Sequence, residues 1–166
     1  GRRGALMLSM SIKHPDSEAF IDAKLDGTKV TGANVSIKAH DEFMRAVIGD
    51  GKYTQQWPVD SDTPSVTKDV DAHAIWNKIV ANNWKSAEPG VLFWDQIIRE
   101  SLPDRYADLG YKTVSTNPCG EIPLCPDDSC RLLCRRLFHL IQNNYQHKTI
   151  LASLNFDEHC NNLEIS

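Results

Sequence analysis

The sequence lacks the features of membrane proteins and of proteins that bind nucleic acids. No apolar run approaches the roughly 20 residues that a membrane-spanning helix needs. Lysine and arginine number 18 against 22 aspartate and glutamate residues, so the net charge is −4 at pH 7. A mildly acidic chain is a poor match for a polyanion, and we expect neither nucleic acid nor membrane among its partners. With 41% hydrophobic and 24% charged residues, the 166-residue chain is typical of one soluble globular domain.

A secretory signal and an even set of cysteines are also missing. No positively charged start precedes an apolar stretch with a cleavage site. The cysteines number five, and four of them lie within sixteen residues. An odd number of cysteines without a secretory signal favours a reducing compartment such as the cytoplasm. There, clustered cysteines are more often catalytic or metal-binding than structural. Because the chain starts without Met and enters an apolar run at once, we expect it to be an internal piece of a longer protein.

Several common catalytic motifs do not occur. The sequence contains no phosphate-binding Gly-x-x-x-x-Gly-Lys-Ser/Thr loop, no Gly-x-Ser-x-Gly elbow and no His-Glu-x-x-His helix. The histidines do not pair at metal-ligand spacing, and for each we expect a solvent-exposed or core role. They are His14, His40, His73, His139, His147 and His159.

Hydrophobic patterning predicts strands that alternate with helices. The expected strands span 5–12, 33–39, 52–57 and 91–94. The expected helices span 14–25, 41–48, 69–87, 95–101 and 129–141, with a polar loop over 58–68. This alternation indicates an α/β fold with mainly parallel strands.

The most informative segment is 115–124, which reads Ser-Thr-Asn-Pro-Cys-Gly-Glu-Ile-Pro-Leu. It places an amide, a thiol and a carboxylate at alternate positions, in Asn117, Cys119 and Glu121. In an extended segment these side chains share one face, with neighbours roughly 6–7 Å apart. All three would then reach one small substrate, which indicates a catalytic loop.

Two residues shape this segment. Pro118 favours an extended Asn117, and Gly120 permits a sharp turn or the close approach of a ligand. The alternative is a Pro-Gly turn with a buried cysteine and a solvated glutamate, since free cysteine is usually a small buried hydrophobe. Three functional side chains on one short loop favour the catalytic interpretation.

Segment 115–124 resembles the finger loop of the ribonucleotide reductase large chain, and its Asn-Pro-Cys-Gly-Glu form resembles the adenosylcobalamin-dependent class II enzymes. Further segments that match the family in order and spacing are Gly-Arg-Arg-Gly-Ala at 1–5, His-Pro-Asp at 14–16, Gly-Ala-Asn-Val-Ser at 32–36, Gly-Val-Leu-Phe-Trp-Asp at 90–95 and Asp-Ser-Cys-Arg-Leu-Leu at 128–133. The resemblance therefore implies part of the reductase barrel domain, including the finger loop, over 1–133. Residues 134–166 are expected to form a divergent continuation.

The resemblance implies roles for the loop residues. Cys119 resembles the cysteine whose thiyl radical abstracts the 3′-hydrogen of the substrate ribose. Glu121 resembles the carboxylate that takes the 3′-hydroxyl proton, and Asn117 resembles the amide that binds and orients the ribose. Cys130, eleven residues after Cys119, resembles one of the two redox-active thiols that supply reducing equivalents.

The basic start of the chain also has a counterpart in the family. Arg2 and Arg3 resemble the end of the loop that carries information from a bound effector nucleotide to the active site, and Arg3 is the better match. From composition alone, an exposed basic terminus is an equally good interpretation.

The implied fold is a fragment of a ten-stranded α/β barrel whose finger loop projects into the barrel centre. The implied reaction converts ribonucleoside di- or triphosphates to 2′-deoxyribonucleotides for DNA synthesis. Adenosylcobalamin is the implied cofactor, and the implied partners are dNTP or ATP effectors, a thioredoxin-like reductant and a second copy in a homodimer. Because the family's upstream redox cysteine and downstream phosphate loop are missing, we expect the fragment to be inactive alone. Unpaired strand edges would also weaken its folding.

Two alternatives remain open. One is a non-catalytic zinc-binding interaction module that uses Cys125, Cys130, Cys134 and His139, although these residues form no Cys-x-x-Cys pair. Without zinc, we expect Cys125 and Cys134 to be structural. The other alternative is the same reductase with its radical supplied by a separate metal-containing subunit, against which the Pro-Cys-Gly pattern at 118–120 argues.

Overall fold

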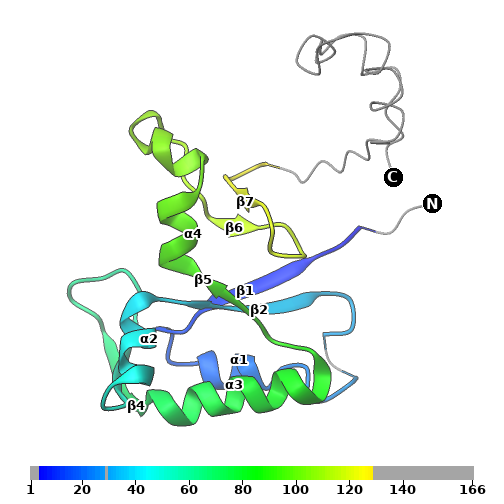
Figure 1. The fold of residues 1–166 in the computed structure, drawn as a ribbon, viewed down its shortest axis with the longest axis vertical. Helices are drawn as coiled ribbons and strands as arrows, with labels where there is room; N and C mark the ends of the chain where they lie inside the picture. The colour runs from blue at the N-terminus through cyan, green and yellow to red at the C-terminus, as the bar shows by residue number, and fades with distance from the viewer. Residues whose placement is uncertain (1–3, 29, 129–166) are drawn as a thin grey trace, which may run out of the picture. The chain divides into compact units, whose positions relative to one another are not determined.

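The computed structural model describes residues 4–28 and 30–128, which form the mixed α/β unit in Figure 1. Its strands are β1 (Met7–Ser11), β2 (Asn34–Ala39), β3 (Lys52–Trp57), β4 (Val66–Asp71), β5 (Gly90–Phe93), β6 (Ser115–Thr116) and β7 (Pro123–Leu124). Its helices are α1 (Ser17–Ile21), α2 (Asp41–Ile48), α3 (Ala72–Ser86), α4 (Trp94–Glu100) and the 3-10 helix η1 (Pro103–Leu109). The α/β fold class expected from the sequence is confirmed.

The central sheet is parallel, with the strand order β1-β2-β5. Ser11 of β1 lies beside Lys38 of β2, and Ala39 of β2 lies beside Phe93 of β5. The other strands form two antiparallel hairpins, β3-β4 and β6-β7. The expectation of mainly parallel strands therefore holds only for the central sheet. Within residues 4–28 and 30–128, these strands form no closed barrel.

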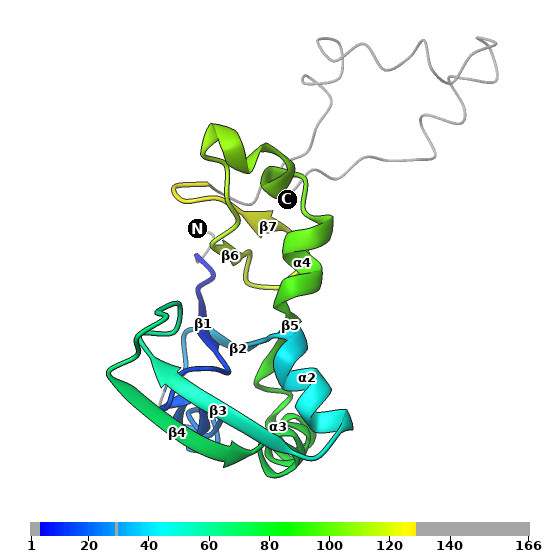
Figure 2. The same cartoon turned by 90° about the vertical axis from the view of Figure 1, so that its left-hand side faces the viewer.

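Helices α1 and α3 cover one face of the sheet, while the β6-β7 hairpin lies on the other side in both ribbon views (Figures 1 and 2). Alternate residues of β2 therefore have different surroundings. The odd positions Val35, Ile37 and Ala39 are buried on the helix side. The even positions, which include Asn34 and Lys38, point to the side of the hairpin.

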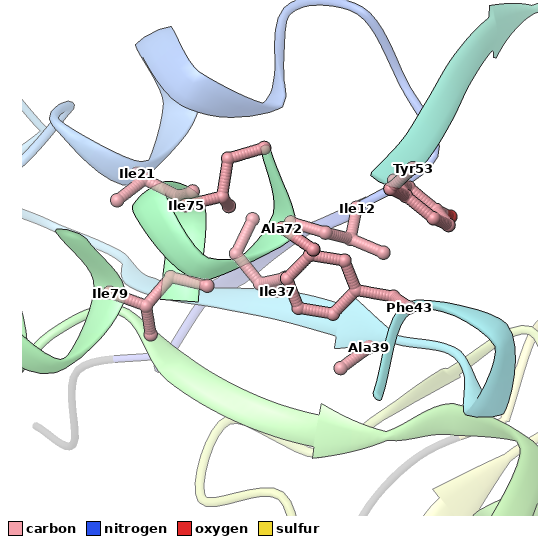
Figure 3. Packing of buried hydrophobic residues seen from close by; sticks show 9 residues of the cluster. All are labelled: Ile12, Ile21, Ile37, Ala39, Phe43, Tyr53, Ala72, Ile75 and Ile79. Atoms are coloured by element: carbon pink, nitrogen blue, oxygen red, sulfur yellow. The ribbon is translucent and has the colours of Figure 1, made fainter. Parts of the chain in front are cut away.

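The hydrophobic core fills the helix side of the sheet, as Figure 3 shows. Its members are large aliphatic and aromatic side chains with at most 4% exposure, together with two alanines. They are Ile12, Ile21, Ile37, Ala39, Phe43, Tyr53, Ala72, Ile75 and Ile79. Asp71 accepts hydrogen bonds from the backbone of His73 and Ala74, which fixes the start of α3.

The loop predicted over 58–68 ends earlier than expected. Strand β4 begins at Val66 and pairs with β3 along its whole length. The helix expected from Asp69 begins only at Ala72 for the same reason. The helix expected over 129–141 lies outside the described residues. No helix in the described part of the chain is long and apolar enough to cross a membrane.

Candidate functional site

The candidate loop is a β-hairpin. Ser115 pairs with Leu124 and Thr116 with Pro123, and residues 117–122 connect the two short strands. The extended conformation expected from Asn117 to Glu121 is therefore wrong, because the chain turns at residues 118–120. The turn follows from the residues between the strands, since proline fixes its own φ and glycine allows a positive one.

Asn117 forms the base of this turn. It is 3% exposed, and its Oδ1 accepts a hydrogen bond of 2.9 Å from the backbone N–H of Ile122. Its own N–H donates to the carbonyl of Ile122 over 3.1 Å, and its carbonyl accepts from Gly120 N–H over 2.9 Å. Asn117 thus closes the turn through both its backbone and its side chain.

Gly120 provides the reversal of the chain that the sequence indicated. Its φ of +85° lies in a region that L side chains rarely adopt. A Cβ atom here would also lie 3.4 Å from Cδ2 of Leu92 on β5. That distance is an ordinary van der Waals contact, so it is the backbone conformation that favours glycine here.

Cys119 and Glu121 flank Gly120, and both are exposed. The structure thus places the thiol and the carboxylate on the solvent side of the turn, and Asn117 at its buried base. The three residues belong to one small unit, but they do not share the single face that an extended segment would give. The buried position of Asn117 carried no clear signal in the sequence, because it depends on the backbone of Ile122 five residues later.

Three contacts fasten the hairpin to the parallel sheet. The side-chain amide of Asn34 donates to the carbonyl of Pro118 over 2.8 Å. The ammonium of Lys38 donates to the carbonyl of Val114 over 2.7 Å. The hydroxyl of Thr116 lies 3.8 Å from the sulfur of Met7 on β1. Both ends of β2 therefore hold the loop, so its turn is positioned by the sheet as well as by its own bonds.

Asn34 and Lys38 were not among the residues predicted for the site. The signal that would have found them is the alternation of β2, where polar side chains at even positions oppose apolar ones at odd positions. Burial lowers the pKa of Lys38, and the charge of Asp60 opposes this shift. The ammonium also lies 3.8 Å from the ring centroid of Trp94, a cation–π contact that supports its position at the base of the hairpin.

Of the other predicted site residues, only Cys125 lies in the described part of the chain. Arg2, Arg3 and Cys130 lie outside the described residues, as do Cys134 and His139 of the zinc alternative. Cys125 is a half-buried free thiol just after β7. It lines an open pocket of about 610 Å³ whose other walls include Leu102, Tyr106 and Tyr111.

Comparison with known proteins gives consistent matches. Residues 1–161 match the family model described as ribonucleotide reductase, barrel domain. The chain is 37% identical over 132 residues to the vitamin B12-dependent ribonucleoside-diphosphate reductase of Thermoplasma acidophilum, covering 79% of this chain and 16% of that protein. It is 32% identical over 133 residues to the enzyme of the same name from Mycobacterium tuberculosis, covering 79% of this chain and 18% of that protein.

A third relative is the vitamin B12-dependent ribonucleotide reductase of Streptomyces clavuligerus. It is 28% identical over 167 residues, covering 86% of this chain and 16% of that protein. The chain thus spans less than a fifth of the length of these curated relatives.

Proposed function

The chain belongs to the ribonucleotide reductase barrel-domain family, and we propose that its β6-β7 hairpin carries the reacting groups of an enzyme that converts ribonucleotides to 2′-deoxyribonucleotides. The observation that carries the proposal is the hairpin turn itself. It presents an exposed thiol and an exposed carboxylate on either side of Gly120, and the turn is held by Asn117 and by the sheet. The relatives carry the reductase name, which supports the same activity for the protein that contains this chain.

In the proposed reaction Cys119 acts as a thiyl radical that removes the 3′-hydrogen of the ribose. Glu121 takes the proton of the 3′-hydroxyl. The 2′-hydroxyl leaves as water after it gains a proton, which the redox-active thiol pair that includes Cys130 would supply. The oxygen of a base must come within about 3 Å of the atom that carries the proton. A reacting atom must come within about 3–3.5 Å of its target atom. Two side chains on one short turn suit both requirements, because a single bound ribose can face them together.

Asn117 is proposed to orient the ribose, as in the family pattern. Its hydrogen bond with Ile122 gives it a second task, which is to keep the turn closed. A loop whose shape is fixed before the substrate arrives loses less entropy on reaching the reactive geometry.

We propose adenosylcobalamin as the cofactor, because the relatives are named vitamin B12-dependent. The cofactor would supply the radical, and Cys119 is the residue that would receive it. The exposure of Cys119 fits this role, since a thiol sealed in the core would be out of reach. A separate metal-containing subunit remains the alternative source of the radical.

The remaining parts of the proposal concern residues that the structure does not describe. Cys130 would supply reducing equivalents and be reduced again by a thioredoxin-like partner, while Arg2 and Arg3 would take part in the response to dNTP or ATP effectors. Residues 1–133 would form part of the barrel domain and 134–166 its divergent continuation, in a homodimeric parent protein. The family match that runs to residue 161 supports a continuation of the same domain. Alone, the chain would be inactive.

The test is reconstitution of the full-length protein with adenosylcobalamin, a dithiol reductant and either ribonucleoside diphosphates or triphosphates. We expect 2′-deoxyribonucleotide to form without any second protein subunit. Formation of product only after a metal-containing subunit is added would replace cobalamin by the alternative radical source. No product under either condition would contradict the reductase proposal.

A further inference from the structure

A second group of polar residues lies at the carboxyl ends of the three parallel strands. Ser11 is the last residue of β1, His40 directly follows β2, and Asp95 lies just after β5 in the first turn of α4. Because the strands are parallel, these three positions meet at one edge of the sheet. That edge is where α/β proteins commonly place their functional groups.

The three side chains form a continuous hydrogen-bonded chain. Nδ1 of His40 lies 2.9 Å from Oδ1 of Asp95, and Nε2 of His40 lies 3.1 Å from Oγ of Ser11. An ionised carboxylate only accepts hydrogen bonds, so Nδ1 must be the donor to Asp95. In the neutral imidazole Nε2 is then the acceptor, and it faces the hydroxyl proton of Ser11.

Backbone groups hold both ends of this chain in place. The backbone N–H of Asp41 donates to Oδ2 of Asp95 over 2.8 Å, and the backbone N–H of Lys13 donates to Oγ of Ser11 over 3.2 Å. Burial alone would raise the pKa of Asp95, but the hydrogen bonds from Asp41 and His40, together with the charges of His40 and Arg99, lower the pKa below its usual value. Asp95 therefore stays charged, which keeps His40 in the required tautomer.

The chain of hydrogen bonds lies on the accessible side of the sheet. Ile12, the next residue after Ser11, is fully buried in the core, so Ser11 points to the opposite side. Its strand neighbour there is Lys38, which binds the base of the β6-β7 hairpin. The side chains of His40 and Asp95 are 25% and 36% exposed, so a small molecule can approach them from solvent.

We propose that Ser11, His40 and Asp95 form a nucleophilic site for small carboxylic esters, separate from the reaction at Cys119. If these hydrogen bonds only fastened α2 and α4 to the sheet, the three groups could be bonded to one another in any order. Here the order is carboxylate, imidazole, hydroxyl, which is the order that activates a serine. The site does not depend on the reductase proposal, because it uses none of the hairpin residues.

The proposed reaction is acyl transfer to water. Ser11 Oγ attacks the ester carbonyl while its proton passes to Nε2 of His40. The bond to the alcohol breaks, and the alcohol leaves with that proton. Water then gives a proton to His40 and attacks the acyl-serine, which releases the carboxylic acid and restores the Ser11 hydroxyl.

A fluorophosphonate probe tests this site in the full-length protein, with the modified peptide identified by mass spectrometry. We expect Ser11 to be phosphonylated in the folded protein and p-nitrophenyl acetate to give a burst of p-nitrophenol. Replacing His40 with Gln should slow the labelling of Ser11 by about 100-fold or more, because the general base is lost. Asp95→Asn should also slow it, because the imidazole loses its orienting carboxylate.

Ser9 supplies the matched control. It is a half-buried serine two residues earlier on the same face of β1, and Ser9→Ala should leave the labelling of Ser11 unchanged. If a His40 or Asp95 variant unfolds, the wild-type protein still decides the question, since labelling should disappear in urea and return on refolding. The proposal is overturned if Ser11 remains unlabelled in the folded protein, or if a folded His40→Gln variant is labelled at the wild-type rate.

Discussion

Oδ1 of Asn117 accepts a hydrogen bond from the backbone N–H of Ile122 at 2.9 Å, and this bond closes the turn that carries Cys119 and Glu121. Asn117 is buried, whereas Cys119 and Glu121 are exposed. The shape of the candidate active loop therefore depends on a residue that sequence patterning placed beside the substrate.

Replacing Asn117 with Ala should leave the N–H of Ile122 without this acceptor. Loss of one partner of a partly buried hydrogen bond costs about 1–3 kcal/mol. We expect faster hydrogen exchange at the Ile122 amide and a lower free energy of unfolding in urea. Asn117→Asp keeps an acceptor oxygen and should behave more like the wild type. An unchanged exchange rate in Asn117→Ala would show that the bond does not hold the turn.

Gly120→Ala tests the strain of the turn. With φ at +85°, an added Cβ places an L residue in the left-handed region and near Leu92. We expect a loss of about 1–2 kcal/mol in the free energy of unfolding. Gly27→Ala is the control, because its φ is not positive and no atom lies within 4 Å of the added Cβ. Equal effects of the two substitutions would argue against a special conformation at residue 120.

Asp104 gives a pH-dependent prediction. Burial alone would raise the pKa of its carboxyl, but hydrogen bonds from the hydroxyl and backbone N–H of Thr113, and from Ser101, lower it below its usual value. A lowered folded pKa means that the stabilisation is fully present above about pH 4, the ordinary range of an unfolded aspartate. It is lost as the pH falls through the lower folded value.

The measurement is urea unfolding of the wild type and of Asp104→Asn at pH 7 and at about pH 2.5. The variant should be less stable at pH 7, and the difference should shrink at the acid pH. A difference that grows as the pH falls would contradict the assigned direction of the shift.

Lys38→Met should loosen the base of the hairpin. The substitution keeps an unbranched apolar stem near Trp94 but removes the donor to the carbonyl of Val114. We expect faster hydrogen exchange across residues 114–124. Lys52→Met, an exposed position on β3, provides the comparison and should leave that region unchanged. Equal hydrogen exchange in the two variants would show that Lys38 does not hold the base of the hairpin.

Hydrophobic patterning predicted those helices and strands whose own residues show the pattern. The predicted bounds of α2 and β3 agree with the structure, because α2 has an apolar face and ends at Gly49. By contrast, β4 is almost wholly exposed, so its residues show no apolar alternation. It is a strand because β3 lies beside it, and only the pairing reveals this.

The site shows the same division. The turn at Gly120 was predictable from the residue itself, while the burial of Asn117 depends on the backbone of Ile122. The contacts among Ser11, His40 and Asp95 join residues 29 and 55 positions apart in the sequence. From the sequence alone, His40 was therefore expected to have only a solvent-exposed or core role. The topology of the parallel strands was needed to bring the three residues together.

The most direct test of the central claim is the rate of 2′-deoxyribonucleotide formation by the full-length protein with Cys119→Ser beside Cys125→Ser. Both positions carry free thiols after the parallel sheet, but only Cys119 lies on the turn of the hairpin. Product formation should fall to background in Cys119→Ser and remain near the wild-type rate in Cys125→Ser. Near-wild-type activity in a folded Cys119→Ser variant would contradict the account.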